Sequence, residues 1–137
     1  MRSSKSTYFV TSLTSVHLFA HLYQVDVQRW YQDRKMTVTP INPKGGSIEG
    51  VDAATRLSDM VTSETAGACA VSIITPPAVT TNIVQEAYSA GITRIWMQPG
   101  SDSAEAVSFG KDHNMTVVHD YCILVSGDQA MSQASKM

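Results

Sequence analysis

The sequence has few cysteines, no excess of positive charge and no long hydrophobic run. Its two cysteines, Cys69 and Cys122, lie far apart, so the closely spaced pairs that mark zinc and redox motifs are missing. We therefore expect free thiols, a cytoplasmic location and no bound metal. The formal net charge is −2, whereas nucleic-acid-binding domains usually have a clear excess of lysine and arginine. We expect no nucleic-acid partner.

Hydrophobic residues make up 43% of the 137 residues, but they form no stretch long enough to span a membrane. The N-terminal segment 8–20 imitates a signal peptide poorly, because threonine, serine and histidine interrupt its apolar run. We therefore expect no membrane partner. A chain of this length is sufficient for one compact domain and one site.

Glycine is missing where a nucleotide-binding protein would most need it. None occurs between Phe9 and Trp30, although the first βα turn of a dinucleotide-binding fold usually has a Gly-x-Gly-x-x-Gly motif. The segment Pro40-Ile41-Asn42 also ends the predicted second strand without the acidic residue that holds the ribose of NAD. An NAD(P)-binding, oxidoreductase-like domain is therefore an alternative rather than the main interpretation.

Short β-branched runs alternate with amphipathic stretches, which is typical of βαβ units. The pattern predicts an α/β, three-layer Rossmann-like fold with a mainly parallel sheet of about five strands flanked by helices. We predict strands at 36–41, 69–74, 92–97 and 116–119. Helices are predicted at 25–34 and 103–113, and a third between them begins at a cap, Thr80 or Thr81, and is ended by Gly91. The serine-rich end predicts a flexible tail at 127–137, which leaves residues 1–126 as a single domain.

Ligands of open parallel sheets bind beyond the carboxyl ends of the strands, and three predicted strand ends are unusual. The first is Asn42-Pro43-Lys44-Gly45, where glycine amides and one compact ammonium group could bind a phosphate together. An ordinary turn explains the same residues, because Asn-Pro and Gly-Gly are common turn sequences.

The second strand end is Thr75-Pro76-Pro77, whose proline rings could form one wall of a slot for a purine, or could simply end the strand. The third contains Trp96, Gln98 and Gly100, and it leads into a helix whose N-terminus favours negative charge. Because an aromatic residue in a central strand usually belongs to the core, Gln98 and the turn amides are the stronger ligand candidates.

Cys122 and His119 are close enough in sequence to suggest a thiol nucleophile or a pair of metal ligands. Residues three apart on an extended strand point to opposite faces, however. The sequence therefore predicts no catalytic residues and no metal site, and a binding module fits it better than an enzyme.

Three segments in the observed order resemble the CoA-binding domain family, the small relatives of the CoA-binding domain in the α subunit of succinyl-CoA synthetase. The segment 38–43 resembles the family's Pro-Val-Asn-Pro strand end, 95–100 its Trp-Met-Gln-x-Gly turn, and 120–123 its Asp-Cys-Ile element. The resemblance spans residues 30–123 and implies the same Rossmann-like fold.

The resemblance implies non-catalytic binding of coenzyme A or an acyl-CoA. It places Lys44 at a CoA phosphate, Pro76 and Pro77 beside the adenine, and Asn42 and Gln98 as orienting groups. The family's Gly-Ala-Ser loop after the first strand is missing, so residues 1–25 are divergent and we expect weaker binding. A fold-retaining interaction protein without a ligand is the other alternative, and a homodimer or a protein partner stays open.

Overall fold

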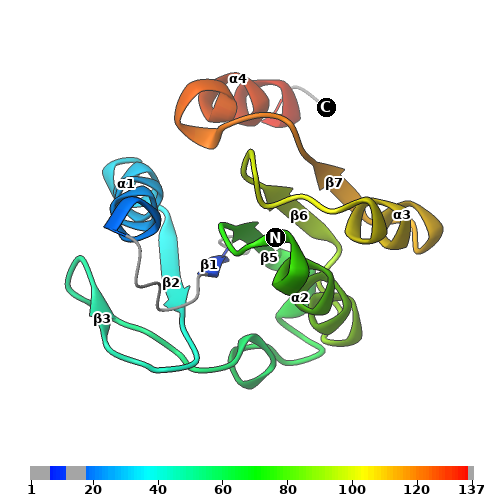
Figure 1. Cartoon of the computed structure of the whole chain (residues 1–137), viewed down its shortest axis with the longest axis horizontal. Coiled ribbons are helices and arrows are strands. Elements are labelled where there is room, and N and C mark those ends of the chain that lie inside the picture. The colour runs from blue at the N-terminus through cyan, green and yellow to red at the C-terminus, as the bar shows by residue number, and fades with distance from the viewer. Residues whose placement is uncertain (1–6, 12–17, 136–137) are drawn as a thin grey trace, which may run out of the picture.

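The computed structural model describes residues 7–11 and 18–135. Five parallel strands form one sheet in the order β2-β1-β5-β6-β7 (Figure 1). The fold prediction is confirmed: the described part of the chain is an α/β, Rossmann-like arrangement. The strands are β1 Thr7–Thr11, β2 Thr37–Ile41, β5 Cys69–Ile73, β6 Arg94–Met97 and β7 Thr116–Val118.

Within the described residues, four helices cover the two faces of the sheet (Figure 1). Helices α1 (Leu18–Asp33) and α4 (Ile123–Ser135) lie on one face, and α2 (Pro77–Ser89) and α3 (Ala104–Asp112) lie on the other. Between β2 and β5 the chain forms a small hairpin and two short 3-10 helices. Their bounds are β3 Ser47–Ile48, β4 Val51–Asp52, η1 Leu57–Met60 and η2 Ala66–Ala68.

Each strand has side chains on both faces, which divides the core into two clusters. Phe9 of β1 packs with Val71 and Ile73 of β5 beneath α2 and α3, whereas the next residue, Val10, packs with Trp30 of α1 on the other face. This alternation follows from the period of two in a strand. Both faces of the sheet are therefore buried, as is usual for parallel sheets.

The C-terminal segment of the structure differs from the prediction, because it forms helix α4. The flexible tail expected at 127–137 is wrong for residues 127–135, because Ile123–Ser135 is helical. Gly127 is buried against α1, and a Cβ atom at this position would lie 2.3 Å from Cζ2 of Trp30. Only glycine permits this approach, so a residue that suggests a loop by its sequence is here a packing contact between two helices.

An ion pair joins the same two helices. Arg34, just beyond the end of α1, donates hydrogen bonds from Nε and Nη2 to the two carboxylate oxygens of Asp128, at 2.6 and 2.9 Å. Its guanidinium group lies 4.1 Å from the centre of the Trp30 ring. The planar guanidinium thus stacks on an aromatic ring while it binds a carboxylate with two hydrogen bonds, an arrangement that lysine could not reproduce.

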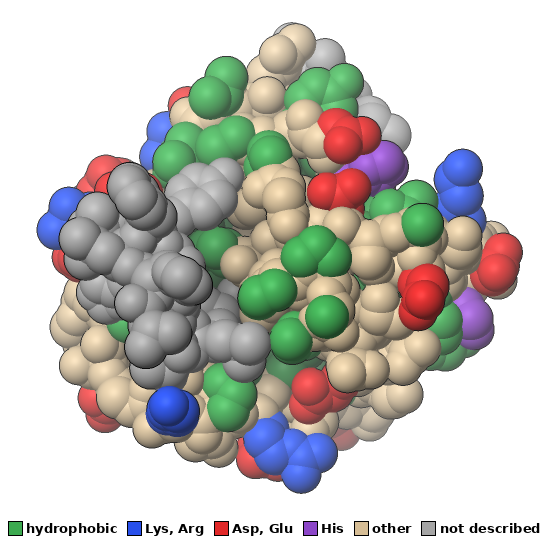
Figure 2. Space-filling view, in the orientation of Figure 1, with side chains coloured by type: hydrophobic (Ala, Val, Ile, Leu, Met, Phe, Trp, Pro, Cys, Tyr) green, Lys and Arg blue, Asp and Glu red, His purple; other side chains and the backbone are tan. Residues whose placement is uncertain are grey.

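No helix in the described ranges is both long enough and apolar enough to cross a membrane. Acidic and basic side chains are interspersed on the face that Figure 2 shows, without a concentrated basic patch. This view agrees with the charge balance of the sequence.

Tyr31 is a buried titratable group on the α1 face, and it gives the fold a pH dependence. Its hydroxyl is hydrogen-bonded to Ser72 of β5, and burial raises the pKa of Tyr31 well above its ordinary value. Above about pH 10 the unfolded chain therefore releases this proton while the folded chain keeps it. The contribution of Tyr31 to stability is complete below that pH and falls as the pH rises further.

We expect the free energy of unfolding to fall between about pH 9 and pH 11 less steeply in Tyr31→Phe than in the wild type, because the variant lacks this group. Urea unfolding across that range measures the slope. Tyr121→Phe, which alters a 58% exposed tyrosine, should keep the wild-type slope. Equal slopes in the wild type and Tyr31→Phe would show that Tyr31 does not contribute.

Candidate functional site

The carboxyl edge of the sheet is where this topology places a ligand. The chain passes from β1 to β2 on one side, and the later strands β5, β6 and β7 are added on the other. The strand order therefore reverses between β1 and β5, and ligands of such folds bind in the crevice at that point. From β2 to β6 there are three strand spacings, or about 14 Å. The segment 12–17, where the glycine loop is missing from the sequence, lies outside the described residues.

The loop after β2 is built around Asn42, which is 7% exposed. Its side-chain Oδ1 accepts a hydrogen bond from the Lys44 backbone N–H at 2.9 Å, and its backbone carbonyl accepts one from Gly45 N–H at 2.9 Å. Its own N–H donates to the Ala54 carbonyl at 2.8 Å. Asn42 thus holds the turn in place, and its side-chain amide oxygen accepts a hydrogen bond from within the protein.

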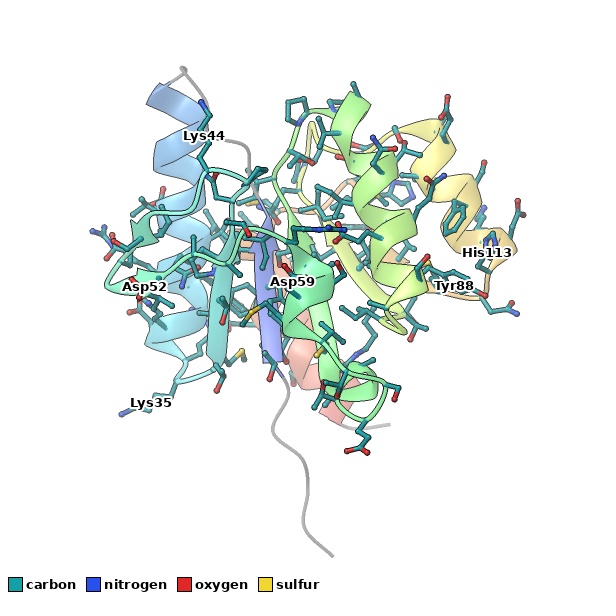
Figure 3. All side chains as sticks on the ribbon, turned by 90° about the horizontal axis from the view of Figure 1, so that it is seen from below. Lys35, Lys44, Asp52, Asp59, Tyr88 and His113 are labelled. Carbon is teal, nitrogen blue, oxygen red and sulfur yellow. The ribbon has the colours of Figure 1, made fainter. Side chains whose placement is uncertain are left out.

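Two glycines and one lysine follow Asn42 at the rim of this edge. Gly45 and Gly46 have φ values of 75° and 88°, a left-handed conformation that glycine adopts without steric cost. Lys44 is exposed and forms no ion pair with another described residue. Figure 3 shows Lys44 beyond the carboxyl end of β2, at the end of the molecule opposite Lys35.

The segment after β5 begins helix α2 directly. Pro76 is the residue before the helix and Pro77 is its first residue, so the expected cap at Thr80 or Thr81 is wrong. Proline fits here because the first turn of a helix needs no N–H donor. Thr80 instead lies 2.9 Å from Thr75, Oγ1 to Oγ1, in a buried contact. Both proline rings are exposed, so their apolar faces are accessible at the carboxyl edge.

A groove of about 480 Å³ separates the first turns of α2 and α3. Pro77 lies at its edge, and Thr81 of α2 is hydrogen-bonded across it to Ser103, 2.8 Å between the two hydroxyl oxygens. This groove was not predicted from the sequence. The feature of the sequence that could have indicated the groove is that α2 and α3 follow two neighbouring parallel strands, so that the first turns of both helices lie side by side.

The residues after β6 have two different environments. Trp96 is partly buried in the α1-side cluster, and its indole Nε1–H donates to the Tyr121 carbonyl at 2.8 Å. Gln98 is fully buried. Its Oε1 accepts a hydrogen bond from Ile123 N–H at 2.8 Å, and its Nε2 donates to Cys122 Sγ at 3.4 Å. Gly100, with φ 90°, is exposed.

Eight of the ten predicted ligand residues divide into two groups, and the other two, Gly45 and Trp96, are partly buried. Pro43, Lys44, Pro76, Pro77 and Gly100 are exposed at the carboxyl edge. Asn42, Thr75 and Gln98 are buried and hydrogen-bonded to other parts of the protein.

Cys122 and the His119 imidazole near the carboxyl edge make separate contacts, whereas Cys69 begins β5 and lies at the opposite edge of the sheet. Cys122 accepts a hydrogen bond from Gln98, whereas His119 Nδ1 lies 2.9 Å from Asp120 Oδ2. Cys69 is buried, and burial raises the pKa of its thiol. A thiol with a raised pKa is a poor nucleophile at neutral pH.

Comparison with known proteins gives a family and several similar folds. The family model described as CoA binding domain matches residues 23–128, and no curated protein matches the sequence. A conserved hypothetical protein from Pyrococcus furiosus has a similar structure, with a TM-score of 0.71 and 22% identity. The match covers 90% of this chain and 99% of that one.

A protein from Thermus thermophilus has a TM-score of 0.73 and 21% identity, over 91% of this chain and 90% of that one. A hypothetical protein from Pyrococcus horikoshii has a TM-score of 0.72 and 17% identity, over 88% and 81%. Identities this low establish a shared fold.

Proposed function

Because the chain belongs to the CoA-binding domain family, we propose that it binds coenzyme A or an acyl-CoA at the carboxyl edge of its sheet, without catalysing a reaction there. The observation that supports this most strongly is the loop after β2. It combines an exposed lysine, which has no ion-pair partner among the described residues, with two left-handed glycines. The Gly45 and Lys44 N–H groups already donate to Asn42, so the Lys44 ammonium group together with the Gly46 amide is what suits a phosphate here.

The adenine would lie against Pro76 and Pro77, whose rings are exposed beside the groove between α2 and α3. An apolar wall next to hydroxyl groups suits a flat heterocycle with polar edges. Thr75 would contribute indirectly, because its hydroxyl contacts Thr80. In this proposal the phosphates lie toward β2 and the base toward α2.

Gln98 and Asn42 act in this proposal as positioning residues. Gln98 holds the start of α4 against the end of β6, and Asn42 holds the turn that contains Lys44. Pro99 has no N–H and the Ser101 N–H donates to the Gln98 carbonyl, so the backbone amide of the exposed Gly100 is the group of this turn proposed for the ligand. The chemistry of these residues supports a non-catalytic role, because Lys44 is the one ionisable side chain among the ten predicted ligand residues.

The lack of glycine between Phe9 and Trp30 supports one competing function, that of an interaction protein that keeps the fold and binds no nucleotide. Glycine lets a phosphate approach the backbone closely, and other residues restrict that approach. The two functions differ in whether CoA changes the carboxyl edge.

An NMR titration of the ¹⁵N-labelled chain separates these functions. We expect CoA to shift the backbone amide signals of Gly45, Gly46 and Gly100, because these amides lie at the proposed site. Gly110, near the opposite end of α3, is the internal control and should stay unchanged. NAD should leave all four signals in place, since the end of β2 has no carboxylate for its ribose.

If millimolar CoA shifted none of these signals, the proposed function would be wrong and the interaction protein would be favoured. Equal shifts with NAD and CoA would instead favour the oxidoreductase-like alternative.

A further inference from the structure

Three side chains that can bind metal ions lie together where β6 and β7 end. Asp102 belongs to the loop between β6 and α3, and His119 and Asp120 follow β7 directly. One ligand atom of each lies within 4.8 Å of the other two. None of the three is among the residues proposed to bind CoA.

The contact between His119 and Asp120 is close to the spacing of two neighbouring metal ligands. Nδ1 of His119 lies 2.9 Å from Oδ2 of Asp120. The same Nδ1 atom is shielded from solvent and has no hydrogen bond, so this approach is close but badly angled for one. Two ligand atoms on a tetrahedral ion, with bonds of about 2.1 Å, are about 3.4 Å apart, so the two atoms need to separate only slightly to bind one ion.

The charge of the cluster also favours a cation. Asp102 and Asp120 bring two carboxylates together, and neither forms an ion pair with any lysine or arginine of the described part of the chain. Like charges at such a distance repel each other. A divalent ion between them would replace that repulsion by two attractive contacts.

We propose that Asp102, His119 and Asp120 form a binding site for a divalent transition-metal ion such as Zn²⁺. One imidazole nitrogen and two carboxylate oxygens are a donor set that such ions accept, whereas Mg²⁺ and Ca²⁺ take oxygen ligands almost entirely. Three protein ligands leave one position of a tetrahedral ion open for water. The side chain of Asp120 is 70% exposed, which gives an ion a path from solvent.

Calorimetric titration of the untagged protein with Zn²⁺, in the absence of CoA, tests the site. We expect one ion per chain in the wild type. Asp102→Asn and His119→Ala should each weaken the affinity by about tenfold or more, since each removes one ligand. The matched control is His113→Ala: this imidazole stacks on Phe109, with 3.9 Å between the ring centres, away from the cluster. It should keep the wild-type affinity.

Circular dichroism of each variant establishes that a change in affinity is not a loss of fold. The proposal would be overturned if the wild type bound no Zn²⁺ at millimolar concentration. It would be overturned equally if folded Asp102→Asn and His119→Ala both bound Zn²⁺ as tightly as the wild type. Because CoA is left out, the result is independent of the proposed nucleotide site.

Discussion

Replacing Gln98 by alanine is expected to lower the free energy of unfolding by about 2–4 kcal/mol. Gln98 is fully buried, and its amide joins the end of β6 to the first residues of α4 through Cys122 and Ile123. The variant leaves the Ile123 N–H without this acceptor in a buried place and opens a cavity around it. Both effects act on the folded state, and urea unfolding monitored by circular dichroism measures their sum.

Gln85→Ala is the matched control, because Gln85 is an exposed residue of α2. Removing the same amide from a solvated helix surface should change stability by no more than about 0.5 kcal/mol. A loss at Gln98 no larger than at Gln85 would mean that the bridge between β6 and α4 does not stabilise the fold.

The environment of Gln98 illustrates what the sequence could predict. Its position after a β-branched run places it correctly at a strand end, and parallel pairing then places that end beside the others. The direction of the side chain depends on α4, which lies far from β6 along the chain. The sequence pattern therefore predicted the edge but missed the role of Gln98 as an internal bridge.

Helix α4 and strand β1 were missed for a related reason. Polar residues and Gly127 suggested a tail, and their helical role depends on the Trp30 ring against which Gly127 packs. The short run 8–10 suggested part of a weak signal peptide, yet β1 pairs with both β2 and β5. Contacts with segments that are distant in the sequence stabilise both α4 and β1, and such contacts cannot be predicted from local periodicity.

The loops after β2 and β5 were predicted better. Two prolines at 76 and 77 can end a strand and begin a helix, and Gly45-Gly46 permits a tight left-handed turn. These local rules act within a few residues, so the sequence alone contains them. Thr80 was misassigned as a cap because the preceding prolines already begin the helix.

Lys44→Ala is expected to weaken CoA binding by about 10- to 100-fold, the range for losing one hydrogen bond between a charged pair. Lys44 is exposed, so the variant should remain as stable as the wild type. The control is Lys35→Asn, at the opposite end of the molecule in Figure 3. Lys35 has a φ of 58°, which asparagine tolerates better than most residues, so this variant removes a positive charge with little backbone strain.

Calorimetric titration of CoA into the wild type, Lys44→Ala and Lys35→Asn tests the proposed site most directly. The proposal predicts saturable binding to the wild type, the same affinity in Lys35→Asn, and the expected loss in Lys44→Ala alone. CoA binding of equal affinity in all three proteins would contradict it, because the phosphate would then be held somewhere other than at Lys44.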